Sequence, residues 1–489
     1  MFSATRRIKR PILVIAACLS LFAGTGLAHR YLLADARWLW VVLPVFCFYA
    51  RRQTWVTLLC VCLLFAGVGW WRGSAMMRSL AAYAVLSKQS VTLVGRATED
   101  GVYGDRSQMV FSMDHVRVTY PRSLSLPGNV AVAGFGMSAV YRGDEVQVTG
   151  KLYPRRGNVQ AGVSFAELRV LVRGNSPIDV LRRKFAAGLL SAVPEPLASF
   201  GLGLLIGQRS TLPPDVAQTL VMVGLTHIIA VSGYNLTIII EAARRLFGGR
   251  SKFQTLAACL ALMACFLLLT GNSPSIVRAG IISTLSIFSW YYGRTVRPLV
   301  LLLTAAAITI AANPLYLWGN VSWYLSFLAF FGVVLVAPVI TRRVYGSREL
   351  KLLAKMVIES LCAEAMTLPY VLYIFGQVST VSLLANVLVA VLVPLAMLLC
   401  TVAGLAGMLL PSAAGWVAWP ARLVLRYMLD AASLISRVPH AFLERIGFSF
   451  AQLMCWYVAL GFLLVLEHYK TRPKHGILTE KNRTETEGV

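Results

Sequence analysis

One apolar stretch of the chain carries four residues of types that hydrocarbon disfavours: His227, Ser232, Gly233 and Asn235. A charge at the centre of a membrane helix costs about 2.5–3.5 kcal/mol on insertion scales, so polar groups there normally face a polar cavity or a partner helix. The Ser-Gly pair also favours unwinding, which exposes amide dipoles to an anion. We therefore expect this segment to line a path for an anionic group. The alternative is a histidine that is hydrogen-bonded within ordinary helix packing.

Other polar residues interrupt apolar segments elsewhere. Arg278 follows a Gly-Asn-Ser-Pro turn near the outer end of an expected span, where a guanidinium either grips phosphate in a fork or snorkels to the headgroups. Glu364 is expected to neutralise Arg278 or to move a proton, and both Glu364 and Asn386 are equally suited to hydrogen-bonding between helices. The predicted lining of the path comprises Arg209, His227, Ser232, Gly233, Asn235, Arg278, Glu364 and Asn386.

The same residues make a poor catalytic site. Helical geometry turns Ser232 well away from His227, and no third group orients them as a nucleophile and base. The sequence contains no Gly-x-x-x-x-Gly-Lys-Ser/Thr phosphate loop and no histidine or cysteine cluster with the spacing of a hydrolytic metal site. We predict that the chain is not an enzyme and that it uses no cofactor or metal.

The elements that must position these residues are membrane helices. Of the 489 residues, 57% are hydrophobic and 14% are charged, and apolar runs of bilayer-spanning length recur without the alternation of a barrel. The expected spans are 11–28, 37–50, 54–71, 216–243, 254–271, 275–292, 298–312, 320–341, 356–376, 381–410 and 449–467. The glycine-rich stretch 198–207 is too short to cross and is expected to be a re-entrant or broken helix, and the end of 381–440 has the charge spacing of an interfacial helix.

Between the first and later spans, the chain changes character. Charges of both signs, alternating strands and Gly- or Pro-containing turns predict a small all-β domain of about five strands over 90–173. An OB-type barrel is the preferred fold, with a β-sandwich as the alternative. Lys151, Arg155 and Arg156 form a small basic cluster in this domain.

The charge pattern sets the expected orientation. The formal net charge is +25, and the positive-inside rule accounts for many of these charges as cytoplasmic loops whatever the ligand. Both termini are expected in the cytoplasm and the β domain outside it. This orientation requires an even number of crossings, so one of the eleven expected spans is miscounted, and we place that miscount within 381–440. The fold class is a polytopic α-helical inner-membrane protein with an inserted OB-like extracytoplasmic β domain. Its parts are N-terminal helices (1–75), the β domain (90–173), a helical core (176–467) and a basic cytoplasmic tail (468–489).

Several motifs taken together resemble the ComEC family of DNA-internalisation competence proteins. They are Gly201-Leu-Gly-Leu-Leu-Ile-Gly-Gln-Arg209, Gly224-Leu-Thr-His-Ile-Ile-Ala-Val-Ser-Gly233 and Ser273-Pro-Ser-Ile-Val-Arg-Ala279, followed by Leu325-Ser-Phe-Leu-Ala329, Leu368-Pro369 and Ala385-Asn386. The resemblance covers nearly the whole chain. It implies a membrane channel for single-stranded DNA with an extracytoplasmic OB-like domain. In such a domain, the basic cluster of Lys151, Arg155 and Arg156 is the candidate DNA contact.

The chain departs from the family pattern at three points. Asn235 stands where the family often has a second histidine, and Trp323-Tyr324 replaces the usual Phe-Gln, so a mechanism that needs two histidines is in doubt. Many relatives also end in a metallo-β-lactamase-like domain, whose histidine cluster this sequence lacks. We expect a short form, with degradation of the second strand left to another protein.

The expected function is translocation of single-stranded DNA into the cytoplasm in natural transformation or DNA scavenging. The expected partners are single-stranded DNA, membrane lipids, an outer DNA receptor, and a separate cytoplasmic ATPase or single-strand-binding proteins, because the sequence encodes no motor. The alternative function is a secondary transporter for a small anionic solute, with Glu364 as proton carrier.

Overall fold

The computed structural model divides into two compact units. The first comprises Met1–Phe327 and Ser379–Phe442, and the second comprises Leu328–Val378 and Leu443–Val489. The structure describes residues 8–33, 54–103, 108–137, 139–154, 157, 159–208, 211–229, 233–271, 274–295, 297–346 and 352–470. The predicted span 37–50 and most of the predicted basic tail lie outside the described residues.

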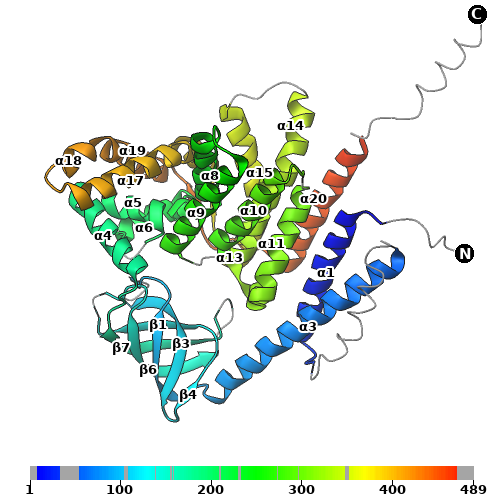
Figure 1. Cartoon of the computed structure of the whole chain (residues 1–489), viewed down its shortest axis with the longest axis horizontal. Coiled ribbons are helices and arrows are strands. Elements are labelled where there is room, and N and C mark those ends of the chain that lie inside the picture. The colour runs from blue at the N-terminus through cyan, green and yellow to red at the C-terminus, as the bar shows by residue number, and fades with distance from the viewer. Residues whose placement is uncertain are drawn as a thin grey trace, which may run out of the picture. The chain divides into compact units, whose positions relative to one another are not determined.

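The first unit begins with two helices, α1 (Arg10–Ala28) and α3 (Trp55–Val85) (Figure 1). Their backbones approach closely, because a Cβ on Gly24 would overlap the carbonyl of Ala66. The hydroxyl of Thr25 donates to the carbonyl of Gly69 across this contact. Helix α3 continues well beyond the predicted end at residue 71, since its 31 residues run on to Val85. At 1.5 Å per residue it is about 46 Å long, more than the hydrocarbon thickness of a bilayer.

A small mixed β domain follows α3. Its strands are β1 (Ser90–Ala97), β2 (Val102–Tyr103), β3 (Met109–Tyr120), β4 (Leu124–Ser125), β5 (Val130–Phe135), β6 (Glu145–Pro154) and β7 (Ala161–Val172). Pairing in the order β1-β6-β7-β5-β3, together with a β1–β3 pairing, closes the five long strands into a ring. Strands β5 and β7 are parallel, and the other pairs in the ring are antiparallel. Alternate residues such as Leu93, Phe111 and Val148 point inward and form the domain's own core.

Five helices come next in the first unit: α4 (Pro177–Ala192), α5 (Leu197–Ile206), α6 (Pro214–Met222), α7 (Thr226–Ile229) and α8 (Gly233–Phe247). Helix α5 has only ten residues and almost all of them are buried, as expected for a short broken helix within protein. The prediction of one continuous span over 216–243 is wrong. Gly224 has a φ of +75°, which a right-handed helix cannot include, so the chain breaks between α6 and α7.

The rest of the first unit is helical. It contains α9 (Lys252–Thr270), α10 (Pro274–Tyr291), α11 (Pro298–Ala312), α12 (Leu315–Gly319), most of α13 (Val321–Phe331), α16 (Ser382–Val389), the 3-10 turn η3 (Ala390–Leu392), α17 (Val393–Leu409), α18 (Ala414–Val417) and α19 (Trp419–Ser436). The predicted 381–410 segment is thus one kinked helix, with the 3-10 turn placed just before Pro394. Helices α4 and α17 cross in backbone contact, since a Cβ on Gly407 would overlap the carbonyl of Gly188.

The second unit contains the end of α13, the π-helical turn η2 (Gly332–Val336), α14 (Ala337–Tyr345), α15 (Leu352–Phe375) and α20 (Phe450–Lys470). Its small core includes Val336, Cys362 and Met366. Two short strands, β8 (Val378–Ser379) and β9 (Phe442–Leu443), complete the described elements.

Six helices among the described residues are long and apolar enough to cross a membrane. They are Arg10–Ala28, Trp55–Val85, Lys252–Thr270, Val321–Tyr345, Ala354–Phe375 and Ser382–Leu409. The chain is therefore a multi-pass membrane protein. The predicted spans 298–312 and 449–467 correspond to shorter apolar helices, and 275–292 forms α10 without meeting the same criteria. The predicted interfacial segment forms α19, in which Arg426 and Asp430 pair at the exposed surface, 3.6 Å apart.

Candidate functional site

The break in the helix at Gly224 creates the candidate site. A Cβ at Gly224 would lie 2.8 Å from the Cβ of Ser382, so only glycine lets the start of α16 approach so closely. The chain then forms the single turn of α7, which carries His227. The break therefore brings His227 next to α16, a helix far away in the sequence.

His227 lies beside the next polar residue of α16. Its Nδ1 is 3.0 Å from the carbonyl oxygen of Gly224, and because a carbonyl only accepts, Nδ1 carries the hydrogen. In the neutral ring, Nε2 is then an acceptor. The Asn386 side chain lies beside this ring. The His227 side chain is exposed, whereas the Asn386 Oδ1 is buried and makes no hydrogen bond. The pair thus offers an accessible imidazole with a buried amide oxygen beside it.

Asn235 occupies a different environment. It is 2% exposed, and its Nδ2 donates to the carbonyl of Leu204 in α5, 3.2 Å away. This bond satisfies a carbonyl close to the end of the short helix, since α5 ends at Ile206. Asn235 therefore fastens α8 to α5.

Arg278 is the third predicted residue that the structure places beside this segment. Its side chain is 7% exposed, its guanidinium donates to the carbonyl of Ser326, and it lies 5.7 Å from the ring centre of Phe327. A Cβ on Gly233 would lie 3.0 Å from one of its Nη atoms. Arg278 is thus held inside the protein against the first residue of α8, in contrast to an arginine that snorkels to the surface.

The remaining predicted path residues are distributed as follows. Arg209 and Ser232 lie outside the described residues. Glu364 is half-buried in α15 of the second unit. The structure therefore brings together His227 with Asn386 and Gly233 with Arg278, two pairings that the sequence could not show.

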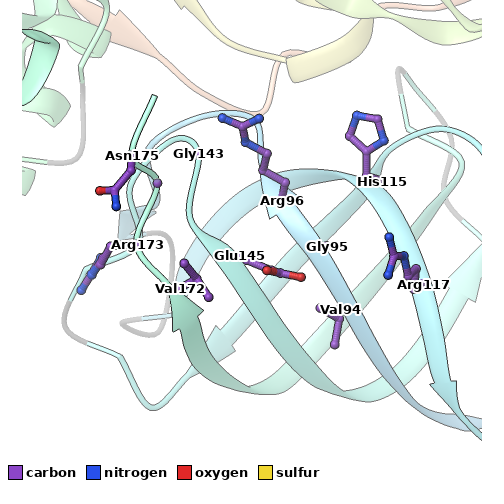
Figure 2. A pocket seen from close by; sticks show the side chains of 11 residues that line it. Val94, Gly95, Arg96, His115, Arg117, Gly143, Glu145, Val172, Arg173 and Asn175 are labelled. Carbon is purple, nitrogen blue, oxygen red and sulfur yellow. The ribbon is translucent and has the colours of Figure 1, made fainter. Parts of the chain in front are cut away.

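The β domain contains a second candidate site, which sequence reasoning missed. An open pocket of about 390 Å³ lies between β1, β3, the start of β6 and the chain after β7. Arg96, His115, Arg117 and Arg173 line it together with Glu145, and Figure 2 shows these side chains around its opening. Three arginines at one pocket favour an anionic ligand, and Glu145 opposes it. Arg173 is already paired with Asp144 at 2.6 Å and Arg96 with Asp179 at 3.6 Å, which leaves Arg117 as the pocket arginine without an ion pair among the described residues.

Local strain shapes one wall of this pocket. The register of β1 and β3 shifts between Val94 and Arg96, which leaves an extra residue in β3, and His115 at this bulge has a φ of +50°. A bulge re-aims the side chains of its strand, and such strain in a non-glycine residue is concentrated at functional sites. From the sequence, the alternation of β1 and β3 could have predicted that Arg96 and Arg117 point to the outside of the domain. It could not have predicted that they line the same pocket.

Of the predicted basic cluster in this domain, only Lys151 is described. It is exposed on β6, whereas Arg155 and Arg156 lie outside the described residues. Lys151 does not line the pocket of Figure 2.

A buried ionic cluster joins the β domain to α4. Arg182 of α4 lies 2.8 Å from Asp100, with both side chains less than a tenth exposed. Asp179 of α4 lies 3.6 Å from Arg96 and 3.8 Å from Arg142. Burial lowers the pKa of Arg182, while the nearby Asp100 carboxylate acts in the opposite direction. These pairs fix the β domain to the first helix that follows it.

The helical site lies in a part of the chain that matches a known family. A family model described as "Competence protein" matches residues 204–470. The chain is also 26% identical over 212 residues to ComE operon protein 3 of Bacillus subtilis (strain 168), an alignment that covers 42% of this chain and 26% of that protein. The chain thus spans about a quarter of the length of this relative. No solved structure matches this one.

Proposed function

Because this chain belongs to the competence protein family, whose model matches more than half of its residues, we propose that it is a membrane channel that passes single-stranded DNA into the cytoplasm. Family membership and the similarity to ComE operon protein 3 support a role in DNA uptake for competence. The finer proposal rests on one structural observation. The broken helix within the matched region presents His227, with the amide side chain of Asn386 beside it.

The physical requirement for such a channel is a wet path. Phosphates cannot enter hydrocarbon without their hydration, so the lining must supply hydrogen-bonding groups that replace it. The Asn386 Nδ2 amide can donate to a phosphate oxygen, and the accessible His227 ring gains a second N–H for this purpose when it is protonated. Arg278 lies against Gly233, the first residue of the helix that follows the turn of His227. Its charge adds positive potential from inside the protein. We assign to these three residues the lining of the path and its immediate support.

We also propose that the β domain is an OB-type barrel on the outer side of the membrane. Its closed ring of five strands, with β5 parallel to β7, supports the OB assignment over a sandwich of two sheets. The outer location follows from the positive-inside rule, with both termini in the cytoplasm. In this proposal the chain itself performs no catalysis, and a separate ATPase or single-strand-binding protein pulls the strand inward.

A transformation assay tests the proposal. His227→Ala and Asn386→Ala should each reduce uptake of transforming DNA at least about tenfold, at unchanged protein levels in the membrane. Ser289→Ala in α10 is the matched control, because its hydroxyl bonds only within its own helix, to Leu285. Normal transformation by both variants would remove these residues from the path.

A second measurement separates DNA transport from the transport of a small anion. Proteoliposomes that contain the chain should admit a labelled single strand when a single-strand-binding protein is enclosed, and should show no saturable, proton-coupled uptake of small anions. Anion uptake that depends on Glu364, without passage of DNA, would support the transporter instead.

A further inference from the structure

Two phenylalanines lie side by side on the outside of the β domain. Phe135 ends β5 and Phe165 lies in β7, and their ring centres are 6.5 Å apart at an angle of 40°. Phe135 is 44% exposed and Phe165 is 63% exposed. Thirty residues apart in sequence, they meet because β5 and β7 pair in parallel. An exposed aromatic pair of this kind contributes little to the domain core, so its position calls for another explanation.

The backbone at Phe165 is strained in a way that turns its ring outward. The registers of β5 with β7 and of β6 with β7 both shift at this residue, so Phe165 is an extra residue in its strand. Its φ is +53°, a conformation that bulky side chains rarely adopt. A bulge that places a large apolar ring in solvent costs stability twice, through strain and through exposure. Such an arrangement is typical of a residue that acts on a ligand.

Cations flank the two rings. On one side, Lys151 of β6 pairs in register with Ser164, the residue before Phe165. On the other side, Phe135 pairs with Glu167, and Arg169 lies two positions further along β7. Lys151, Glu167 and Arg169 are all exposed. The outer face therefore carries an aromatic pair between two positive charges, with one carboxylate beside it.

The outer face continues from Arg169 toward the pocket of Figure 2. Arg169 pairs with Gln147, Gln147 with Val94, and Val94 with Arg117, so the row crosses three strand spacings, or about 14 Å. Val94 and Arg117 both line the pocket. Positive side chains thus occur at both ends of one row across the surface.

We propose that Phe135 and Phe165 form a stacking platform for the unpaired bases of single-stranded DNA, with Lys151 and Arg169 binding the adjacent phosphates. The proposal rests on the proposed function for the identity of the nucleic acid. It gives Lys151, a member of the predicted basic cluster, a specific role in binding phosphate. Flat rings between cations fit a strand whose π faces and phosphates alternate. A protein or lipid partner would be served by aliphatic side chains equally well. Duplex DNA hides its bases, so this surface selects the single strand.

The test measures binding of the full-length chain in lipid nanodiscs to a fluorescent oligothymidylate and to a duplex of the same length, at fixed salt. Phe135→Ala and Phe165→Ala should each weaken single-strand binding about fivefold or more, which corresponds to about 1 kcal/mol per stacked base. Duplex binding should not change. Tyr120→Ala is the matched control, because Tyr120 is also an exposed aromatic residue, with 63% of its surface accessible. It lies at the last position of β3, whereas the residue of β3 that pairs with Gly134, next to Phe135, is Met109 at the first position.

Conservative substitutions distinguish stacking from apolar docking. Phe165→Tyr should retain single-strand affinity, because it keeps an aromatic ring. Phe165→Leu should lose as much single-strand affinity as Phe165→Ala. Glu167→Gln should strengthen binding, because it removes the one carboxylate beside the rings. The proposal is overturned if Phe165→Leu binds single strands as tightly as the parent. It is also overturned if the alanine variants lose duplex and single-strand binding together, or if they leave DNA binding unaffected because lipid or protein covers the rings.

The two proposals fail separately. A chain that imports DNA while binding single strands independently of both rings refutes the platform alone. A chain that binds through the rings but passes no DNA in the proteoliposome assay refutes the channel alone.

Discussion

Arg278 of α10 and Ser326 of α13 are joined by a hydrogen bond from the guanidinium to the backbone carbonyl. Replacing Arg278 with methionine leaves that carbonyl without this donor, at an expected cost of about 1–3 kcal/mol in stability. Arg278→Lys keeps the charge but not the planar fork of the guanidinium. Its stability should therefore lie between that of the methionine variant and that of the parent. Thermal unfolding of the purified chain and transformation frequency are the two measurements. Equal stability of all three proteins would show that the bond contributes nothing.

The bond from Asn235 to the carbonyl of Leu204 predicts a specific stability effect. Asn235→Ala should lower the free energy of unfolding by about 0.6 kcal/mol and by no more than about 1.7 kcal/mol, the mean and the maximum for hydrogen bonds between membrane helices. Thr237→Ala, two residues further along α8, is the control, because its exposed hydroxyl bonds only to Gly233 within the same helix. Equal denaturant midpoints for the two variants would contradict a role for Asn235 in fastening α8 to α5.

The contact of Gly224 with Ser382 predicts partial rescue. Gly224→Ala should destabilise the chain by about 1–2 kcal/mol through its positive φ alone, with a further loss from the Cβ placed 2.8 Å from Ser382. Adding Ser382→Gly removes the clash and leaves the backbone strain. The double variant should therefore recover part of the lost stability, as measured by thermal unfolding in detergent. If Ser382→Gly brings no recovery, the two segments do not approach as described.

The pair of Asp100 and Arg182 predicts strong coupling between the β domain and α4. Arg182→Met leaves a buried carboxylate without its main partner and should cost about 3–5 kcal/mol. Asp100→Asn combined with Arg182→Met should be milder than Arg182→Met alone, because no uncompensated charge remains. A double-mutant cycle on thermal unfolding measures the coupling, and strictly additive effects would argue against the buried pair.

The sequence predicted the elements more accurately than their interruptions. Apolar runs and alternating strands gave α1, α9 and the β domain, since both patterns are local and set by burial. The end of α3 was missed because residues 72–85 are too polar to suggest a span, although they continue its helix. The break at Gly224 was missed because an apolar run hides a single residue of positive φ.

The candidate site was predictable only in its residue types. Polar residues in apolar segments identified His227, Arg278 and Asn386, but their neighbours come from helices distant in sequence. The pairing of Phe135 with Phe165 was equally out of reach, because it depends on a parallel pairing and a bulge. Contacts of this kind follow from topology, which a single sequence does not specify.

Helix α4 has a mechanical consequence for the whole first unit. Its beginning is held to the β domain by Asp179 and Arg182, and further along, Gly188 presses backbone to backbone on α17. Around this crossing, the Phe185 ring packs on Gly404 and the Met408 side chain packs on Gly188, so the two helices interlock. Helix α4 is therefore the physical connection between the β domain and α17, which continues from α16, the helix that carries Asn386.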